Sequence, residues 1–238
     1  MYTQKKPPRI SVVVPVLNEA KIIDKLLGKI SNLPGTEVII CDGGSTDDTV
    51  KVCRRYTNNI VHSRPGRGFQ LNRGAEQASG DILFFLHADS LIDTKVFDDI
   101  RQAIEHGYYW GCCTIDFDED SLFFRLLAWF STWRGRLVSS CYGDQGIYCL
   151  KDVFNTMQGF PETPFLEDIA FSRKIRRHYR AHVIPGRLTT SARRFREGGI
   201  FKTIVKMQFI KILYKLGMSP QYLIQFYKSG KQREFSCE

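Results

Sequence analysis

Residues 10–42 read ISVVVPVLNEAKIIDKLLGKISNLPGTEVIICD and indicate the class of fold. The β-branched run at Ile10–Val16 predicts a strand that is buried in a parallel sheet. Apolar residues then recur at helical spacing, so we expect a helix that Asn18 caps and that Pro34-Gly35 ends. Glu37–Cys41 is the next β-branched run. A strand, a helix and a second strand in this order form the repeating unit of a parallel α/β sheet.

The same alternation continues to Leu86. Ser45–Asp48 has the form of a capping box and predicts the start of a second helix. A brief strand at Ile60-Val61, a helix that Gly80 closes and a very apolar strand at Asp81–Leu86 follow. We therefore predict an α/β fold with a mainly parallel central sheet and helices on both faces. In such sheets, ligands bind beyond the carboxyl ends of the strands.

After residue 110 the strands and helices no longer alternate regularly. We expect strands at 110–117 and 146–150, an aromatic-rich helix at 122–133, a helix at 164–177, extended chain at 182–184 and 187–191, and a long amphipathic helix at 200–216. Neither an internal repeat nor a linker rich in Pro, Gly or Ser is present. One domain with a helical C-terminal extension is the simplest interpretation.

Composition excludes several classes of protein. The chain has 238 residues, of which 43% are hydrophobic, so it is long and apolar enough to form a core without disulfides. The seven cysteines are odd in number and show no CxxC spacing, which argues against a disulfide framework or a zinc ribbon. The apolar run that starts at Ile10 is too short for a signal peptide, and no run could span a membrane. We therefore expect a cytoplasmic protein.

Charge is distributed unevenly along the chain. The net charge is +9, but residues 1–172 carry −4 and residues 173–238 carry +13. Such asymmetry indicates contact with an anionic partner, which is a nucleic acid, a phospholipid surface or a phosphorylated ligand. A basic face that is merely solvated is the alternative.

Three acidic clusters lie where ligands are expected. Asp42–Asp48 follows the second strand, and its Asp42 is placed to accept hydrogen bonds from a ribose or a base. Asp89 follows the fourth strand and is suited to hold Mg²⁺ or Mn²⁺, with His87 as a weaker candidate. Glu167-Asp168 opens a predicted helix and offers a general base. Each cluster, taken alone, could instead have a purely structural role, in a turn, as a helix cap or as acidic residues that complement a helix dipole.

Together and in this order, the clusters resemble the motifs of family-2 glycosyltransferases, which are inverting enzymes with the nucleotide-sugar-binding GT-A fold. The matching motifs are Ser11–Glu19, Asp42–Asp48, Gly80-Asp81, His87–Asp89, Gly143–Gln145 and Glu167-Asp168. A finer pattern in Gly66–Gly74, Phe85–Asp89 and Thr190–Arg194 resembles the subgroup of radical-SAM/selenodomain-associated transferases. The resemblance covers about residues 9–227. It implies a GT-A domain at 1–198, with a nucleotide-binding half at about 9–110 and an acceptor half at about 111–198, and a basic helical extension at 199–238.

The resemblance also implies roles for individual residues. Asp168 matches the catalytic base, and we expect Glu167 to hold it in place. Asp89 stands in the metal motif, whose first Asp is replaced by His87 here, and the divalent ion would be Mn²⁺ or Mg²⁺. Gly143, Asp144 and Gln145 are expected on the acceptor side. The residues expected along the nucleotide sugar are Pro15, Leu17, Asn18, Glu19, Asp42, Gly43, Arg67, Gln70, Asn72, Ala88, Arg193 and Arg194.

One element departs from the family pattern. Ser191–Phe195 only loosely resembles the Gln-x-x-Arg-Trp element, because both its Gln and its Trp are replaced. This departure, and the lack of a membrane-spanning run, weigh against a processive polymer synthase.

The predicted reaction is transfer of a sugar from a nucleoside diphosphate to an acceptor hydroxyl with inversion. We expect the donor to be a UDP-sugar rather than a GDP-sugar. The sequence does not identify the acceptor, and a lipid-linked acceptor is among the candidates. A nucleic-acid-binding protein and a nucleotidyltransferase on a similar sheet are the alternatives. The basic C-terminal region favours the first, but its aromatic residues lie at helix-packing positions. The second would need a Gly-rich, basic loop after the first strand, which Pro15–Glu19 is not.

The two long helices of the second half allow two interpretations. The aromatic-rich helix at 122–133 packs against the core or presents a lipid-facing or acceptor-binding surface. In the 200–216 helix, the lysines form no single basic stripe, so we expect packing plus loose attraction to anionic lipid at the inner face of the membrane. The apolar side of that helix consists of Phe201, Val205, Phe209, Ile212 and Leu216.

Overall fold

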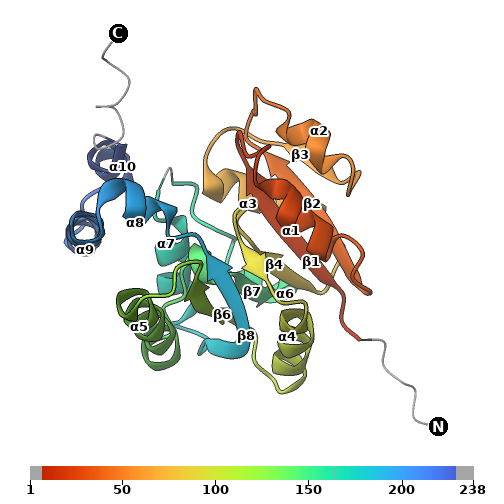
Figure 1. Cartoon of the computed structure of the whole chain (residues 1–238). Coiled ribbons are helices and arrows are strands. Elements are labelled where there is room, and N and C mark those ends of the chain that lie inside the picture. Colours follow the sequence, from red (N-terminus) through yellow and green to blue (C-terminus); the bar gives the residue numbers. More distant parts are fainter. Residues whose placement is uncertain (1–6, 164, 229–238) are drawn as a thin grey trace.

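The computed structural model describes residues 7–163 and 165–228, with the side chains of Arg194 and Lys228 excepted. Within these residues, one eight-stranded sheet has the order β3-β2-β1-β4-β7-β6-β8-β5 (Figure 1). The strands are β1 (Ile10–Val16), β2 (Thr36–Asp42), β3 (Ile60–His62), β4 (Ile82–Phe85), β5 (Leu91–Ile92), β6 (Trp110–Phe117), β7 (Ile147–Leu150) and β8 (His182–Thr190). The helices are α1 (Ile23–Ile30), α2 (Thr49–Cys53), α3 (Arg67–Gln77), α4 (Lys95–Glu105), α5 (Leu122–Val138), α6 (Lys151–Thr156), α7 (Glu167–Ile175), α8 (Arg193–Gly198), α9 (Ile200–Lys215) and α10 (Pro220–Lys228), and a 3₁₀ turn, η1, covers Gly143–Gln145.

The direction of the strands brings one loop to an unexpected place. β3, β2, β1 and β4 are parallel to one another, whereas β7 is antiparallel to both β4 and β6. Ile147, at the start of β7, therefore pairs with Phe85, at the end of β4. As a result, η1 lies at the edge of the sheet where β4 ends.

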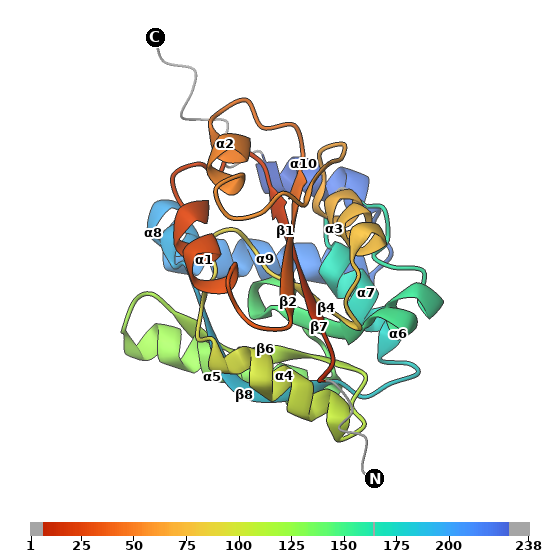
Figure 2. The same ribbon diagram turned by 90° about the vertical axis from the view of Figure 1, so that its right-hand side faces the viewer.

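Helices cover both faces of the sheet, as predicted (Figure 2). Val12 and Val14 of β1 belong to a core that includes the apolar sides of α1 and α4. Val13, which points to the other face, belongs to a second core with residues of α3, α6 and α7. This alternation follows from the period of two residues in a strand, and both cores are dominated by fully buried aliphatic and aromatic side chains.

Two predicted helix caps are wrong. Asn18 lies several residues before α1, and its side-chain oxygen accepts a hydrogen bond from the Thr46 amide instead. The expected capping box at Ser45–Asp48 does not form either, because α2 begins at Thr49 and has no side-chain cap. Both groups of polar residues instead link the loop after β1 to the loop after β2.

Other elements differ from expectation through pairing that periodicity does not reveal. The two expected extended segments at 182–184 and 187–191 form the single strand β8, whose register against β6 shifts after Cys113. The helix expected at 164–177 is the shorter α7, and Pro164 lies outside the described residues. The sequence did not predict the short strand β5 or the helices α4, α6 and α8.

The C-terminal helices pack on the rest of the chain through a small apolar cluster. Ile210 of α9 and Leu223 of α10 are buried against Phe165 and Leu166, which precede α7. The side of α9 that was expected to pack is instead exposed: the exposed fractions of Phe201 and Leu216 are 81% and 79%. Each helix in the described residues is too short or too polar to cross a bilayer.

The close packing of α3 on the sheet depends on Gly74. A Cβ atom at this position would lie 2.3 Å from Cys41 Sγ and 2.4 Å from Val13 Cγ1. We expect Gly74→Ala to lower the free energy of unfolding by about 1–3 kcal/mol, because the helix must move away from the sheet. Urea denaturation measures this loss, with Gln77→Ala at an exposed position of the same helix as the control. Equal stability of the two variants would contradict the prediction.

Candidate functional site

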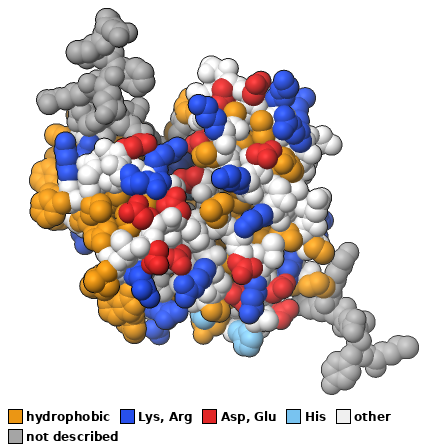
Figure 3. Space-filling view, in the orientation of Figure 1, with side chains coloured by type: hydrophobic (Ala, Val, Ile, Leu, Met, Phe, Trp, Pro, Cys, Tyr) orange, Lys and Arg blue, Asp and Glu red, His pale blue; other side chains and the backbone are white. Residues whose placement is uncertain are grey.

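Two groups of polar residues gather along one edge of the sheet. The loops after β1 and β2 form the first group, and the loop after β4, η1 and the start of α7 form the second. The helix α3 connects them, because its Gln70 reaches the first group and its Arg67, one turn earlier, reaches the second. In Figure 3, acidic and basic side chains gather in the region between α8–α9 and the first three helices.

Asp42 is the centre of the first group. Its carboxylate, only 2% exposed, accepts hydrogen bonds from the Gly44 and Ser45 amides at 3.2 and 3.0 Å, and His62 Nδ1 lies 3.2 Å away. Burial alone would raise the pKa of Asp42, but the hydrogen bonds from Ser45, Gly44 and His62 outweigh it and lower that pKa. Asp42 is therefore a carboxylate that holds the loop Gly43–Ser45 in a fixed shape.

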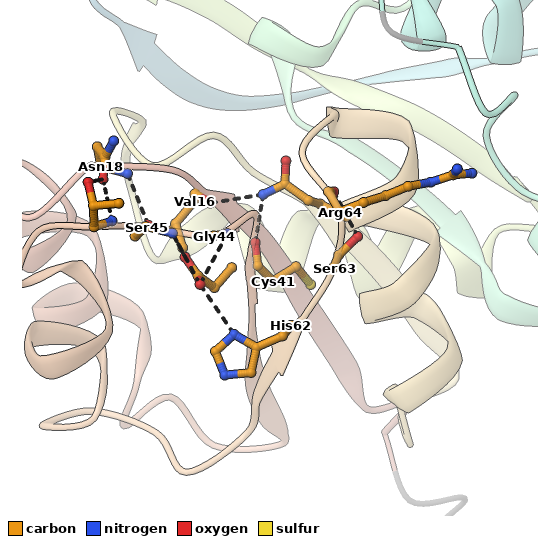
Figure 4. Close-up of polar contacts among 11 residues, drawn as sticks. Val16, Asn18, Cys41, Gly44, Ser45, His62, Ser63 and Arg64 are labelled. Carbon is orange, nitrogen blue, oxygen red and sulfur yellow. Dashed lines mark hydrogen bonds and ion pairs between the residues drawn. The ribbon is translucent and has the colours of Figure 1, made fainter.

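Asn18 binds this loop from the other side (Figure 4). The Asn18 amide donates to Ser45 Oγ at 3.0 Å, and its side-chain oxygen accepts from the Thr46 amide at 2.8 Å. Asn18 has a φ of 56°, a left-handed conformation that asparagine tolerates better than most residues. The loops after β1 and β2 thus form one hydrogen-bonded unit, with Asn18 and Ser45 exposed or half-exposed.

Gln70 and Asn72 support the site through the backbone. Gln70 Nε2 donates to the carbonyl oxygens of Val16 and Cys41, at 2.9 and 2.8 Å, and so joins the ends of β1 and β2. Asn72 exchanges two hydrogen bonds with the backbone of Phe160, at 2.8 and 2.9 Å. Both side-chain amides are therefore committed to protein partners, although the sequence led us to expect them along a ligand.

An ion pair between the half-exposed Arg67 and the buried Glu167 is the centre of the second group. Arg67 Nε lies 2.8 Å from Glu167 Oε1, and the Glu167 side chain is 2% exposed. Glu167 Oε2 is buried without a hydrogen-bond partner in the described chain. Burial raises the pKa of Glu167 to about 7, while the Arg67 guanidinium opposes this rise and the neighbouring Asp168 adds to it.

Asp168 is aimed at η1. Its Oδ2 atom accepts a hydrogen bond from the Gly143 amide at 2.8 Å, and its Oδ1 atom accepts one from the Ile169 amide at 2.7 Å. Leu166, two residues earlier, has a φ of 63°, a conformation that is costly for a leucine and that turns the chain into α7. This strained turn places a half-exposed carboxylate at the edge of the sheet.

Gly143 brings His87 close to Asp168. A Cβ atom on Gly143 would lie 2.8 Å from His87 Nε2 and 3.3 Å from Asp168 Oδ2, so a larger residue would push these groups apart. Burial and the nearby Arg67 guanidinium lower the pKa of His87. The imidazole is therefore neutral at pH 7, which is the form that binds metal ions.

The oxygen and nitrogen atoms of the second group suit a divalent ion that is also bound to a phosphate. Within the described residues, no three His, Cys, Asp or Glu side chains are placed to hold a metal together. However, Mg²⁺ and Mn²⁺ at phosphate sites need only one or two protein ligands, since phosphate oxygens and water supply the rest. Asp89, with His87 two residues before it, fits that requirement, and Asp144 Oδ1 is a buried oxygen that has no hydrogen-bond partner in the described chain.

The structure adds three residues that the sequence did not single out. Tyr142 lies between two cations, with the Arg134 guanidinium 3.4 Å and the Lys211 ammonium 4.5 Å from its ring centroid. Burial and the charge of Arg134 lower the pKa of Lys211. Tyr142 could have been found as the neighbour of Gly143, but Lys211 comes from α9 and carried no local signal.

The remaining predicted residues are distributed as follows. Pro15 and Ala88 are buried, Leu17 is exposed and Asp89 is half-exposed. The Glu19 amide binds Thr49 Oγ1, and Gly43 donates its amide to the Val16 carbonyl. Gln145 is fully buried and accepts hydrogen bonds from Arg134 and the Tyr142 amide, so it shapes η1 from within. Arg193 is exposed beside Glu197, and the side chain of Arg194 lies outside the described residues.

Comparison with known proteins gives a family. The family model described as "Glycosyl transferase family 2" matches residues 11–156, which is more than half of the chain. An alignment over 122 residues, which covers 46% of this chain, is 29% identical to GalNAc(5)-diNAcBac-PP-undecaprenol beta-1,3-glucosyltransferase of Campylobacter jejuni and covers 39% of that protein. An alignment over 100 residues, which covers 37% of this chain, is 39% identical to glucosyl-3-phosphoglycerate synthase of Mycobacterium tuberculosis and covers 31% of that protein. The chain therefore spans well under half the length of these curated relatives.

Solved structures show the same fold at low sequence identity. S. aureus TarS 1-349 superposes with a TM-score of 0.63 and 19% identity, covering 96% of this chain and 72% of that one. The mannosyltransferase PcManGT from Pyrobaculum calidifontis, in complex with GDP-Man and Mn²⁺, also gives 0.63 and 19%, covering 96% and 71%. The M. tuberculosis synthase with Mg²⁺ and UDP gives 0.58 and 22%, covering 77% and 70%. These likenesses confirm the predicted GT-A fold.

Proposed function

Because the chain belongs to glycosyl transferase family 2, we propose that it moves a sugar from a nucleoside diphosphate to an acceptor hydroxyl with inversion. The observation that carries the proposal is the juxtaposition of Asp168, Gly143 and His87 beside the Arg67–Glu167 ion pair. A carboxylate fixed by a backbone amide, next to groups suited to a phosphate-bound ion, is what in-line sugar transfer requires.

The donor is proposed to bind across the two groups of residues. The fixed loop around Asp42, Asn18 and Ser45 would hold the nucleoside, since it offers backbone and side-chain polar groups at the ends of parallel strands. Its diphosphate would lie towards Asp89. A UDP-sugar is favoured, in line with the UDP that the M. tuberculosis synthase binds, although PcManGT binds GDP-Man.

Asp168 is the proposed general base. Sugar transfer with inversion passes through a transition state with oxocarbenium character, and the attacking hydroxyl must lose its proton to a nearby group. The Gly143 amide holds Asp168 Oδ2 in place, and the neighbouring Arg67–Glu167 pair fixes the first turn of α7. Arg67 thus supports the base, whereas the sequence suggested a place along the donor.

Asp89 and His87 are the proposed ligands of Mn²⁺ or Mg²⁺. When bound, such an ion offsets the negative charge that develops on the departing diphosphate. The chain's own part is to present a carboxylate and a neutral imidazole at the end of β4, where a diphosphate can meet them.

The acceptor side is proposed to include Asp144, whose buried Oδ1 lacks a hydrogen-bond partner in the described chain and could accept one from a hydroxyl. A lipid-linked acceptor is one candidate, because the C. jejuni relative is named for an undecaprenol-linked substrate.

The likeness to the radical-SAM/selenodomain-associated subgroup also stays a prediction. The nucleic-acid alternative fits less well, since the basic helix α9 flanks its lysines with exposed apolar side chains.

Calorimetric titration tests the donor and metal sites together. We expect a UDP-sugar to bind more tightly with Mn²⁺ than without, and Asp89→Ala to remove this difference, because the ion then loses its protein carboxylate. Asp93→Ala, an exposed aspartate four residues further on, is the matched control and should bind like the wild type. Equal metal dependence in wild type and Asp89→Ala would remove Asp89 from its role, and no binding of any UDP- or GDP-sugar would overturn the proposed function.

A further inference from the structure

Most of the exposed large apolar side chains of the described chain lie on three helices. On α5 they recur at intervals of three and four residues, so they form one stripe along the helix, and the same is true of α9. The stripe on α5 consists of Leu122, Leu126, Trp129, Phe130, Trp133 and Leu137. The stripe on α9 consists of Phe201, Val205, Phe209 and Ile212 and continues to Leu216 just after the helix, and α10 adds Tyr222 and Phe226.

The two stripes belong to one side of the molecule. Both helices lie on the left-hand side in Figure 1, where they are seen nearly end-on, and α9 carries α10 beside it. In the space-filling view of Figure 3, apolar side chains accumulate along this same edge, over α9 and over α5. Exposed apolar surface of this extent is unusual for a face that meets only water.

Every charged residue on these helices is basic. The sequences of α5, α9 and α10 contain no Asp or Glu. At about 100° per residue, the exposed Lys202 and Lys215 lie on opposite sides of the α9 stripe, and the exposed Arg125 and Arg136 lie beside the α5 stripe. Cationic side chains at the margins of an aromatic and aliphatic stripe are the arrangement of helices that lie in the headgroup region of a bilayer.

We propose that α5 and α9 form a docking surface for an anionic phospholipid bilayer. The apolar stripes would enter the region between headgroups and acyl chains, while the flanking lysines and arginines would contact lipid phosphates. A second copy of the chain fits this face poorly, since pairing it with itself would bring like charges together.

The docking surface is continuous with the candidate site. Arg134 of α5 and Lys211 of α9 lie against the ring of Tyr142, next to Asp144. The same two helices therefore carry the exposed stripes on one side and border η1 on the other. A bilayer bound to them would lie beside the acceptor half of the site, within reach of an acceptor that is itself embedded in lipid.

Sedimentation with vesicles tests the proposal with the full-length chain. We expect the wild type to sediment with phosphatidylcholine vesicles that contain 30% phosphatidylglycerol, and to bind pure phosphatidylcholine at least tenfold less. Phe201→Ser/Phe209→Ser and Lys202→Glu/Lys215→Glu should each lower the partition coefficient by at least about tenfold. The matched control, Lys51→Glu/Arg54→Glu, makes the same change of charge on and just after α2 and should bind like the wild type.

Three results would overturn the proposal. They are a wild type that stays in the supernatant with both kinds of vesicle, a charge control that loses binding as fully as Lys202→Glu/Lys215→Glu, and light scattering that shows a dimer which Phe201→Ser/Phe209→Ser converts to a monomer. The assay needs no nucleotide sugar, so its failure is separate from failure of the proposed function. Calorimetry with the donor checks that each variant retains its nucleotide site.

Discussion

Asp168→Asn is expected to lower the rate constant of sugar transfer by about 10²–10⁴-fold and to leave the dissociation constant of the donor nearly unchanged. Asparagine has the shape of aspartate and keeps an oxygen that can accept the Gly143 amide, so η1 and α7 should stay in place. Its amide cannot take a proton from the attacking hydroxyl. The loss should therefore fall on the chemical step alone.

This prediction can be checked before the acceptor is known. Release of UDP measures transfer to water with the donor that calorimetry selects, and the same titration measures donor binding. Asp152→Asn is the matched control, since Asp152 is an exposed aspartate in the first turn of α6, as Asp168 is in the first turn of α7. A variant that retains turnover would exclude Asp168 as the base, and one that fails to bind the donor would place Asp168 at the donor instead.

Arg67→Met is expected to lower the free energy of unfolding by about 3 kcal/mol at pH 8.5. Removing one member of a buried ion pair leaves the other as a buried charge without compensation, at a cost of about 3–5 kcal/mol. We expect the lower end of this range, because the Arg67 side chain is 37% exposed, although Glu167 is only 2% exposed. Arg73→Met is the control: it removes an arginine of the same helix from an exposed pair with Glu76, also at 2.8 Å, and should cost about 0–1 kcal/mol.

The loss in Arg67→Met should depend on pH. The pKa of Glu167 is about 7 in the folded protein, above its value of 4.5 in an unfolded chain, and it rises further without the guanidinium. A carboxyl with a raised pKa favours folding while it is protonated, and that contribution is lost as the pH rises through the folded-state pKa. Urea denaturation at pH 5.5 and 8.5 should thus show a smaller loss at the lower pH. A loss that is equal at both values would mean that Glu167 is not the group left unpaired.

Local pattern was sufficient to predict the first, mainly parallel part of the sheet. The strands β1, β2 and β4 follow from β-branched runs, because strands of a parallel sheet are buried on both faces. The intervening helices follow from apolar residues at helical spacing, because one side of each helix packs on the sheet. Parallel strands bring their carboxyl ends to one edge, so the position of Asp42 and of the residues after β4 along the same edge of the sheet also followed from the sequence. The details of the loops did not: Asn18 and Ser45 were assigned to helix caps, and they bind each other's loops instead.

Tertiary structure alone decided the second half of the site. No local signal indicates that β7 runs antiparallel to β4, yet this pairing brings Gly143 to His87 and Asp168. The partnership of Arg67 with Glu167 and the approach of Lys211 to Tyr142 likewise join residues that are far apart in the chain.

The helix α9 shows most clearly the difference between what local pattern predicts and what tertiary packing determines. The sequence alone predicts that this helix has an apolar side, because a helix repeats every 3.6 residues. Whether that side is covered depends on which elements pack against it, and the structure buries Ile210 on Phe165 and Leu166 while Phe201 and Leu216 face outward. The periodicity of a sequence predicts which side of a helix is apolar. Whether other parts of the chain cover that side depends on how distant segments pack.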